Sequence, residues 1–124
     1  RDLHKPVHSF PTRRSSDLFL AQLFAQNPKL LLLDEPSSHL DLAYQKQVLS
    51  LISGWLKQDG RAVISVMHDL AVARRFGTRV MMLNHGHIEA DNAPEKALSP
   101  ALLSRVYGMD VDAWMQDLYA IWND

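Results

Sequence analysis

Blocks of apolar residues recur along the chain at spacings that predict strands and helices in alternation. The run Leu30–Leu33 is apolar at every position, which is typical of a strand buried on both faces of a parallel sheet. Four strands are predicted, the last two as a hairpin, over residues 29–33, 62–66, 79–83 and 87–90. Helices are predicted over residues 19–26, 42–57, 70–76, 94–98 and 100–107, while residues 109–124 show no clear period. This alternation predicts an α/β fold with a mainly parallel sheet.

Polar residues and glycine mark the ends of two of these helices. Asp41 and Asp69 directly precede predicted helices, where a side-chain oxygen can accept a hydrogen bond from an unpaired backbone N–H group. Gly77 follows the helix over residues 70–76 and is a typical helix stop. The two aspartates are therefore expected to act as helix caps.

Composition limits the class of protein. The chain has 124 residues, enough for one modest domain, and a net charge of −1, so no basic field suggests nucleic acid as a partner. It contains no cysteine, which fits a reducing compartment and gives no disulfide framework. No apolar run approaches the ~18 residues that a membrane span needs, and no signal peptide is visible. We expect a soluble cytoplasmic protein or the soluble subunit of a membrane complex.

The first 18 residues differ in character from the rest. They show no helical or strand period and carry four Lys or Arg against two Asp, a net +2, whereas the other 106 residues carry nine basic and twelve acidic side chains, a net −3. Residues 8–18 are what a common short-read sequencing adapter would encode if it were translated. We expect residues 1–18 to be an artefactual or disordered segment; a flexible basic arm is the alternative.

Two carboxylates, Asp34 and Glu35, follow the apolar run directly. Ligands bind at the carboxyl ends of strands in an open α/β sheet, so this pair suggests a cation or a catalytic task. A crossover between parallel strands would place the ends of strands 29–33 and 62–66 at the same edge. The alternative is a core strand that runs into an acidic turn.

With the following loop and strand included, the sequence resembles the ATP-binding subunit of ABC transporters. Residues 30–36 resemble the Walker B strand with its adjacent catalytic glutamate, residues 38–41 (Ser-His-Leu-Asp) resemble the D-loop, and His68 resembles the switch histidine. The resemblance implies a partial P-loop NTPase (RecA-like) fold that is incomplete at the N-terminus. It also implies ATP and Mg²⁺ as cofactors.

The resemblance assigns a role to each matched residue. Asp34 is implied as the Mg²⁺ ligand, and Glu35 and His68 as catalytic residues that act on the attacking water and the γ-phosphate. Ser38 and Asp41 are implied as cofactor-binding residues that face a second ATPase subunit across a head-to-tail dimer. The alternatives are that Asp41 acts only as a helix cap and that His68 is an ordinary loop histidine.

Further motifs refine the resemblance and limit it. Residues 40–45 and 104–108 resemble importers of iron–siderophore, haem or cobalamin. The chain contains no GxxxxGK[ST] loop, no glutamine loop and no LSGGQ signature. We therefore expect residues 19–112 to be the C-terminal part of a nucleotide-binding domain and residues 113–124 to be a tail.

The implied function is ATP hydrolysis that powers an ABC import system. It implies transmembrane permease subunits as partners, no nucleic acid, and a cytoplasmic location at the inner face of the membrane. A non-transport ABC ATPase of DNA repair or translation is one alternative, and a non-enzymatic interaction module that uses the exposed strand edge and the Trp-bearing tail is another.

Other residues that could carry chemistry have simpler interpretations. His85 and His87 flank a hairpin turn and are expected to be solvated rather than metal ligands. Trp55 is expected in the core, and Trp114 and Trp122 in the core or at an interface.

Overall fold

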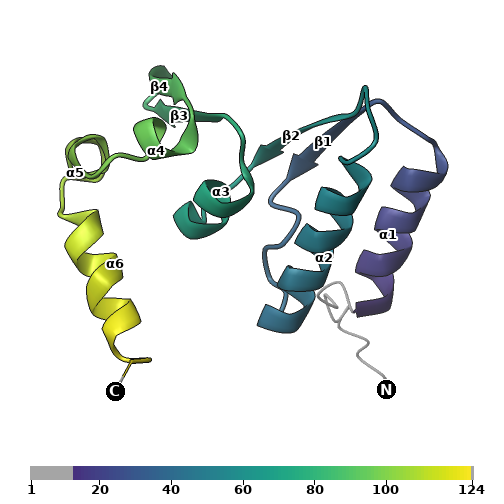
Figure 1. The fold of residues 1–124 in the computed structure, drawn as a ribbon, viewed down its shortest axis with the longest axis horizontal. Coiled ribbons are helices and arrows are strands. Elements are labelled where there is room, and N and C mark those ends of the chain that lie inside the picture. Colours follow the sequence, from purple (N-terminus) through teal and green to yellow (C-terminus); the bar gives the residue numbers. More distant parts are fainter. Residues whose placement is uncertain (1–12, 124) are drawn as a thin grey trace, which may run out of the picture. The chain divides into compact units, whose positions relative to one another are not determined.

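A computed structural model of the chain describes residues 13–123. The chain forms two compact units, divided in the sequence between Val66 and Met67 (Figure 1). Each unit has its own cluster of buried apolar side chains. None of the helices in the described residues is both long and apolar enough to cross a bilayer.

The first unit is a pair of parallel strands with two helices. Its elements are, in order, α1 (Arg13–Ala25), β1 (Leu30–Asp34), α2 (Leu42–Trp55) and β2 (Ala62–Val66). β1 and β2 pair in parallel, with Leu30 opposite Ala62 and Asp34 opposite Val66. This confirms that the two strands are parallel neighbours and places their carboxyl ends at the same edge.

One face of the β1–β2 pair is covered by helices and the other face is exposed. Leu31 and Leu33 are buried together with side chains from α1 and α2, namely Leu20, Val48, Ile52 and Trp55. Leu30 and Leu32 alternate with them and are 48% and 71% exposed. The prediction that this strand is buried on both faces is therefore wrong for this unit, because both helices supply core residues on the same face.

The second unit is a β-hairpin with four helices. Its elements are α3 (Leu70–Phe76), β3 (Val80–Asn84), β4 (His87–Asn92), α4 (Pro94–Ala97), α5 (Pro100–Tyr107) and α6 (Val111–Ala120). β3 and β4 are antiparallel, with Asn84 opposite His87 on either side of the turn. Met82 is buried with side chains that follow the hairpin, Leu98, Leu103 and Val111. The predicted hairpin is confirmed, and its strands end one or two residues later than expected.

Two helices differ from the sequence-based expectation. α1 begins at Arg13, inside the segment expected to be artefactual or disordered, whereas the predicted helix begins at residue 19. Residues 1–12 lie outside the described residues, so the interpretation of that segment stays a prediction. Residues 109–124, for which no element is predicted, contain α6. Its apolar residues Val111, Trp114, Met115 and Leu118 do follow helical spacing, but Tyr119, Ile121 and Trp122 directly after them obscure the period.

Candidate functional site

The candidate site lies at the carboxyl edge of the β1–β2 pair. β1 ends at Asp34, which is exposed, and Glu35 is half-buried one residue beyond the strand. The backbone N–H of Glu35 donates to the carbonyl oxygen of Val66, with 2.9 Å between the two atoms. The hydrogen bonding between the strands therefore continues past the end of β1 and fixes the backbone of Glu35 to the end of β2.

The backbone of Glu35 has an unusual conformation. Its φ angle is 46°, in the left-handed region that residues other than glycine rarely adopt, and His39 in the same loop has φ 62°. The carbonyl oxygen of Glu35 accepts a hydrogen bond from the N–H of Ser38 at 3.1 Å, so Glu35 is held on both sides. Such strain persists where the surroundings enforce it, and it is frequent at functional sites.

The loop after Glu35 leads into α2 through a helix cap. Oδ1 of Asp41 accepts a hydrogen bond from the backbone N–H of Tyr44 at 2.9 Å, which confirms Asp41 as the N-cap of α2. Ser38 is half-buried, and its neighbour Ser37, which the sequence pattern does not single out, is buried. The contact of Ser38 and Asp41 with a second subunit stays a prediction.

Four of the five predicted site residues lie at the end of β1 and in the loop that follows it, and the fifth lies in the other unit. Asp34, Glu35, Ser38 and Asp41 are within eight consecutive residues of the first unit. His68 is exposed in the segment that links β2 to α3, and Asp69, directly after it, caps α3 through the N–H of Val72 at 3.0 Å. The approach of His68 to the carboxylates stays a prediction.

The donor set at this edge fits Mg²⁺. Carboxylate oxygens are hard ligands, and Mg²⁺ is usually held by one or two carboxylates together with substrate phosphates and water. Asp34 and Glu35 supply two carboxylates. Within the described residues no three or more His, Cys, Asp or Glu side chains gather as a complete metal cage. His85 and His87 are exposed at the hairpin turn, as expected.

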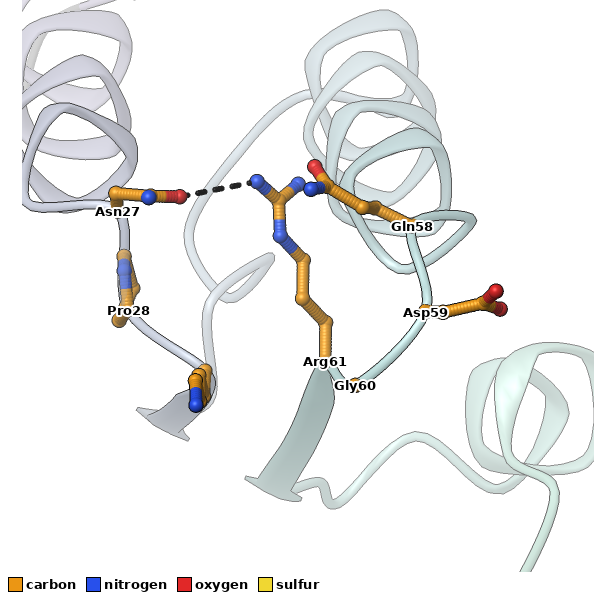
Figure 2. A pocket seen from close by; sticks show the side chains of 7 residues that line it. Asn27, Pro28, Gln58, Asp59, Gly60 and Arg61 are labelled. Carbon is orange, nitrogen blue, oxygen red and sulfur yellow. Dashed lines mark hydrogen bonds between the residues drawn. The ribbon is translucent and has the colours of Figure 1, made fainter.

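The opposite, amino edge of the same strand pair holds a small hollow of about 330 Å³ (Figure 2). Figure 2 shows Arg61 extending between Asn27 and Gln58, while Asp59 points away from it. Nη2 of Arg61 donates to Oδ1 of Asn27 at 3.2 Å, and Nη1 donates to the carbonyl oxygen of Trp55 at 3.0 Å. The guanidinium also lies 4.8 Å from the centre of the Trp55 ring. These contacts join the ends of both helices to β2, so we interpret this edge as structural.

The chain is similar in sequence to ATP-binding proteins of ABC transporters. It is 38% identical over 109 residues to the ABC transporter ATP-binding protein YvrA of Bacillus subtilis (strain 168), covering 88% of this chain and 25% of that protein. It is 41% identical over 90 residues to the hemin import ATP-binding protein HmuV of Plesiomonas shigelloides, covering 73% of this chain and 34% of that protein. A hemin import ATP-binding protein HmuV of Nocardia farcinica is 39% identical over 112 residues, and the match covers 88% of this chain and 38% of that protein.

Two solved structures resemble the fold. One is an inward-facing conformation of a metal-chelate type ABC transporter, with a TM-score of 0.70 and 26% identity, covering 77% of this chain and 38% of that chain. The other is a dimeric post-hydrolysis state of an ATP-binding cassette bound to ADP and Pi. It has a TM-score of 0.58 and 31% identity, and the match covers 65% of this chain and 34% of that chain. No protein-family model matches the chain. The chain spans between a quarter and two fifths of the length of these similar proteins.

Proposed function

The chain belongs to the ATP-binding proteins of ABC transporters, and on this basis we propose that it carries the catalytic carboxylates of an ATPase that powers import. In this proposal residues 19–112 are the C-terminal part of a nucleotide-binding domain, and residues 113–124 are its tail. The observation that carries the proposal is the pair Asp34 and Glu35 at the carboxyl end of β1, with the strained backbone of Glu35 tied to β2.

The proposed reaction is hydrolysis of ATP to ADP and phosphate. Water attacks the γ-phosphorus, and the bond from that phosphorus to the bridging oxygen of the β-phosphate breaks. Glu35 orients the water and accepts its proton, and Asp34 would hold Mg²⁺ through its carboxylate. A bound Mg²⁺ would supply positive charge beside the phosphate oxygens, where negative charge develops. His68 donates a hydrogen bond from its ring to the γ-phosphate.

Other parts of the assembly complete the proposed site. The sequence contains no GxxxxGK[ST] loop, so residues outside this chain hold the triphosphate in this proposal. Ser38 and Asp41 face a second ATPase subunit, in keeping with the dimeric state of one similar structure. Transmembrane permease subunits hold the protein at the cytoplasmic face of the membrane. Two of the relatives are named as hemin import proteins, which favours haem over iron–siderophore or cobalamin as the imported compound.

The test uses a full-length protein in which residues 19–112 replace the matched segment of the Plesiomonas relative. We expect Mg²⁺-dependent ATP hydrolysis, and we expect Asp34→Asn to raise the Mg²⁺ concentration needed for half-maximal turnover. Asp59→Asn is the matched control, because Asp59 is an exposed aspartate at the opposite edge of the same strand pair. Equal Mg²⁺ dependence in both variants would contradict the assignment of Asp34.

Two further measurements test the remaining parts of the proposal. His68→Ala should slow turnover and leave ATP affinity nearly unchanged, because its contact is with the γ-phosphate alone. Hemin uptake by cells that lack their own import ATPase tests the imported compound. ATP hydrolysis without hemin uptake would retain the ATPase and reject haem as its cargo.

A further inference from the structure

The C-terminal segment of the second unit has a one-sided charge. Residues 108–124 contain four aspartates, at positions 110, 112, 117 and 124, and no Lys, Arg or His, which gives a net charge of −4. Within this segment α6 carries most of the apolar and aromatic side chains. An acidic helix rich in aromatic residues is an unusual surface, because charged helices seldom expose several large apolar side chains together.

α6 buries one part of its apolar surface and exposes another. Val111 is buried, and Met115 packs beside it on the core of the second unit. Trp114, Leu118 and Ile121, at helical spacing, are 53%, 40% and 66% exposed. Trp122, just beyond the helix, is 85% exposed. In Figure 1, α6 extends away from α5 toward the C-terminus, and the residues of its second half, 116–120, are all exposed.

We propose that Trp114, Leu118, Ile121 and Trp122, here called the α6 face, are a docking site for a cationic amphipathic helix of a partner protein. The spacing of the first three residues suits a helix that packs alongside α6. Large aromatic side chains are the usual anchors of such interfaces. This inference does not depend on the proposed ATPase activity.

The acidic side chains beside the α6 face determine the sign of the partner's charge. Asp117 is exposed and lies within one helical turn of both Trp114 and Ile121. Asp110 caps α6 through the N–H of Ala113 at 2.9 Å, and Asp112 accepts a hydrogen bond from Nε2 of Gln116 at 2.8 Å. These two carboxylates therefore keep their charge in fixed positions on the first turn. Asp110 and Asp117 lie four and three residues from Trp114, on the same side of α6, where Lys or Arg side chains of the partner would complement them, whereas Asp112 lies on the other side of the helix.

Charge argues against two other occupants of this exposed apolar face, a second copy of the chain and a membrane. A second copy of the chain would bring two segments of net charge −4 together, and like charges at an interface are unfavourable. The cytoplasmic surface of a membrane is also negative, and it attracts basic rather than acidic segments. A cationic helix is the occupant that satisfies both the apolar and the acidic parts of this surface.

The test compares two synthetic peptides that form amphipathic helices of the same length, one of Leu and Lys and the other of Leu and Glu. Binding of each peptide to the full chain is measured by calorimetry at low and at high salt. We expect the Lys peptide to bind at least ~10-fold more tightly at low salt, and salt to reduce this preference. Equal binding of the two peptides would overturn the proposal.

Variants locate the binding surface. Ile121→Ala and Trp114→Ala should each weaken binding of the Lys peptide by ~10-fold or more, as expected for an interface anchor. Asp117→Asn should weaken it less, and mainly at low salt. Ile64→Ala is the matched control, because Ile64 is 62% exposed on the apolar face of the strand pair in the first unit. If Ile64→Ala reduced binding as much as Ile121→Ala does, the peptide would bind elsewhere on the chain. That result would contradict the proposal.

Two measurements without peptide test the other occupants. If sedimentation shows a dimer of the chain that Ile121→Ala dissociates, the α6 face binds a second copy and the proposal is wrong. If the chain binds vesicles of anionic phospholipid and Ile121→Ala abolishes that binding, the occupant is a membrane, and the proposal is equally wrong. A circular dichroism spectrum of each variant that matches the parent protein shows that α6 is retained.

Discussion

Backbone hydrogen bonds join both edges of the β1–β2 pair, from Ala62 to Lys29 at the amino edge and from Glu35 to Val66 at the carboxyl edge, and the amino edge is also held by a long side chain. At the amino edge, the Arg61 side chain contacts Asn27, the Trp55 carbonyl oxygen and the Trp55 ring. At the carboxyl edge, backbone hydrogen bonds from Glu35 to Val66 and from Ser38 to Glu35 hold the loop. A loop held by its backbone tolerates changes in its side chains. The carboxylates at that edge can therefore serve chemistry, whereas Arg61 at the other edge serves the fold.

Glu35→Gln should have the largest effect, and this effect should be on turnover. In the full-length chimaera we expect ATP hydrolysis to fall by ~10²–10⁴-fold, the usual contribution of a general base, because an amide accepts no proton from water. The backbone hydrogen bond to Val66 does not involve the side chain and should be retained, and ATP affinity should change little. Hydrolysis close to the parental rate would contradict the catalytic role of Glu35. The carboxyl edge would then have no catalytic function to contrast with the structural role of the amino edge.

Arg61→Ala should show the opposite pattern, with a loss of stability and no direct effect on the reaction. Two hydrogen bonds and a cation–π contact are lost, which predicts about 1–3 kcal/mol less free energy of unfolding. Urea denaturation measures this difference. Arg74→Ala, at an exposed arginine of α3, is the control and should change stability little. If Arg61→Ala slowed hydrolysis in fully folded protein, the amino edge would have more than a structural role.

Asp41→Ala separates the helix cap from the predicted contact with a second subunit. Loss of the hydrogen bond to the Tyr44 N–H should cost about 1 kcal/mol of stability. Asp110→Ala removes the same kind of cap from α6, where the N–H of Ala113 is the donor, and should cost a similar amount. If Asp41 also faces a second subunit, only Asp41→Ala lowers turnover measured well below the melting temperature. Equal turnover in the two variants would leave Asp41 as a cap alone.

The smallest expected effect is on how the stability of the chain depends on pH. It comes from an ion pair that lies outside both edges of the strand pair. Nε and Nη2 of Arg79 lie 2.6 Å and 2.7 Å from the two carboxylate oxygens of Asp91. The hydrogen bond from Arg79 holds the pKa of Asp91 below its ordinary value. A carboxyl group with a lowered pKa contributes full stability above that ordinary value, about 3.9, and loses it as the pH falls through the lowered pKa.

Asp91→Asn should therefore reduce the acid dependence of the urea midpoint and leave the midpoint near neutral pH only slightly changed. The effect is small because both side chains are exposed to solvent, which weakens their interaction. If the full acid dependence persisted in Asp91→Asn, carboxylates elsewhere would be responsible.

Local signals in the sequence determined most of the elements. The apolar run before Asp34 and the residues 62–66 predict β1 and β2, and Asp41 and Asp69 are the caps that their positions predict. These signals act within a few residues, so the sequence carries them without reference to the rest of the fold. The resemblance of residues 30–36 to a family motif likewise predicts the two candidate carboxylates at a strand end without any structure.

Only the tertiary structure decided which faces are covered and how the edges are held. The exposure of Leu32 depends on both helices packing on the other face of the strand pair, which no local pattern specifies. The left-handed backbone of Glu35 depends on its hydrogen bond to Val66, 31 residues later in the chain. Arg61 likewise reaches Asn27, 34 residues before it. Such contacts join residues that are distant in sequence, so they exist only once the strands have paired.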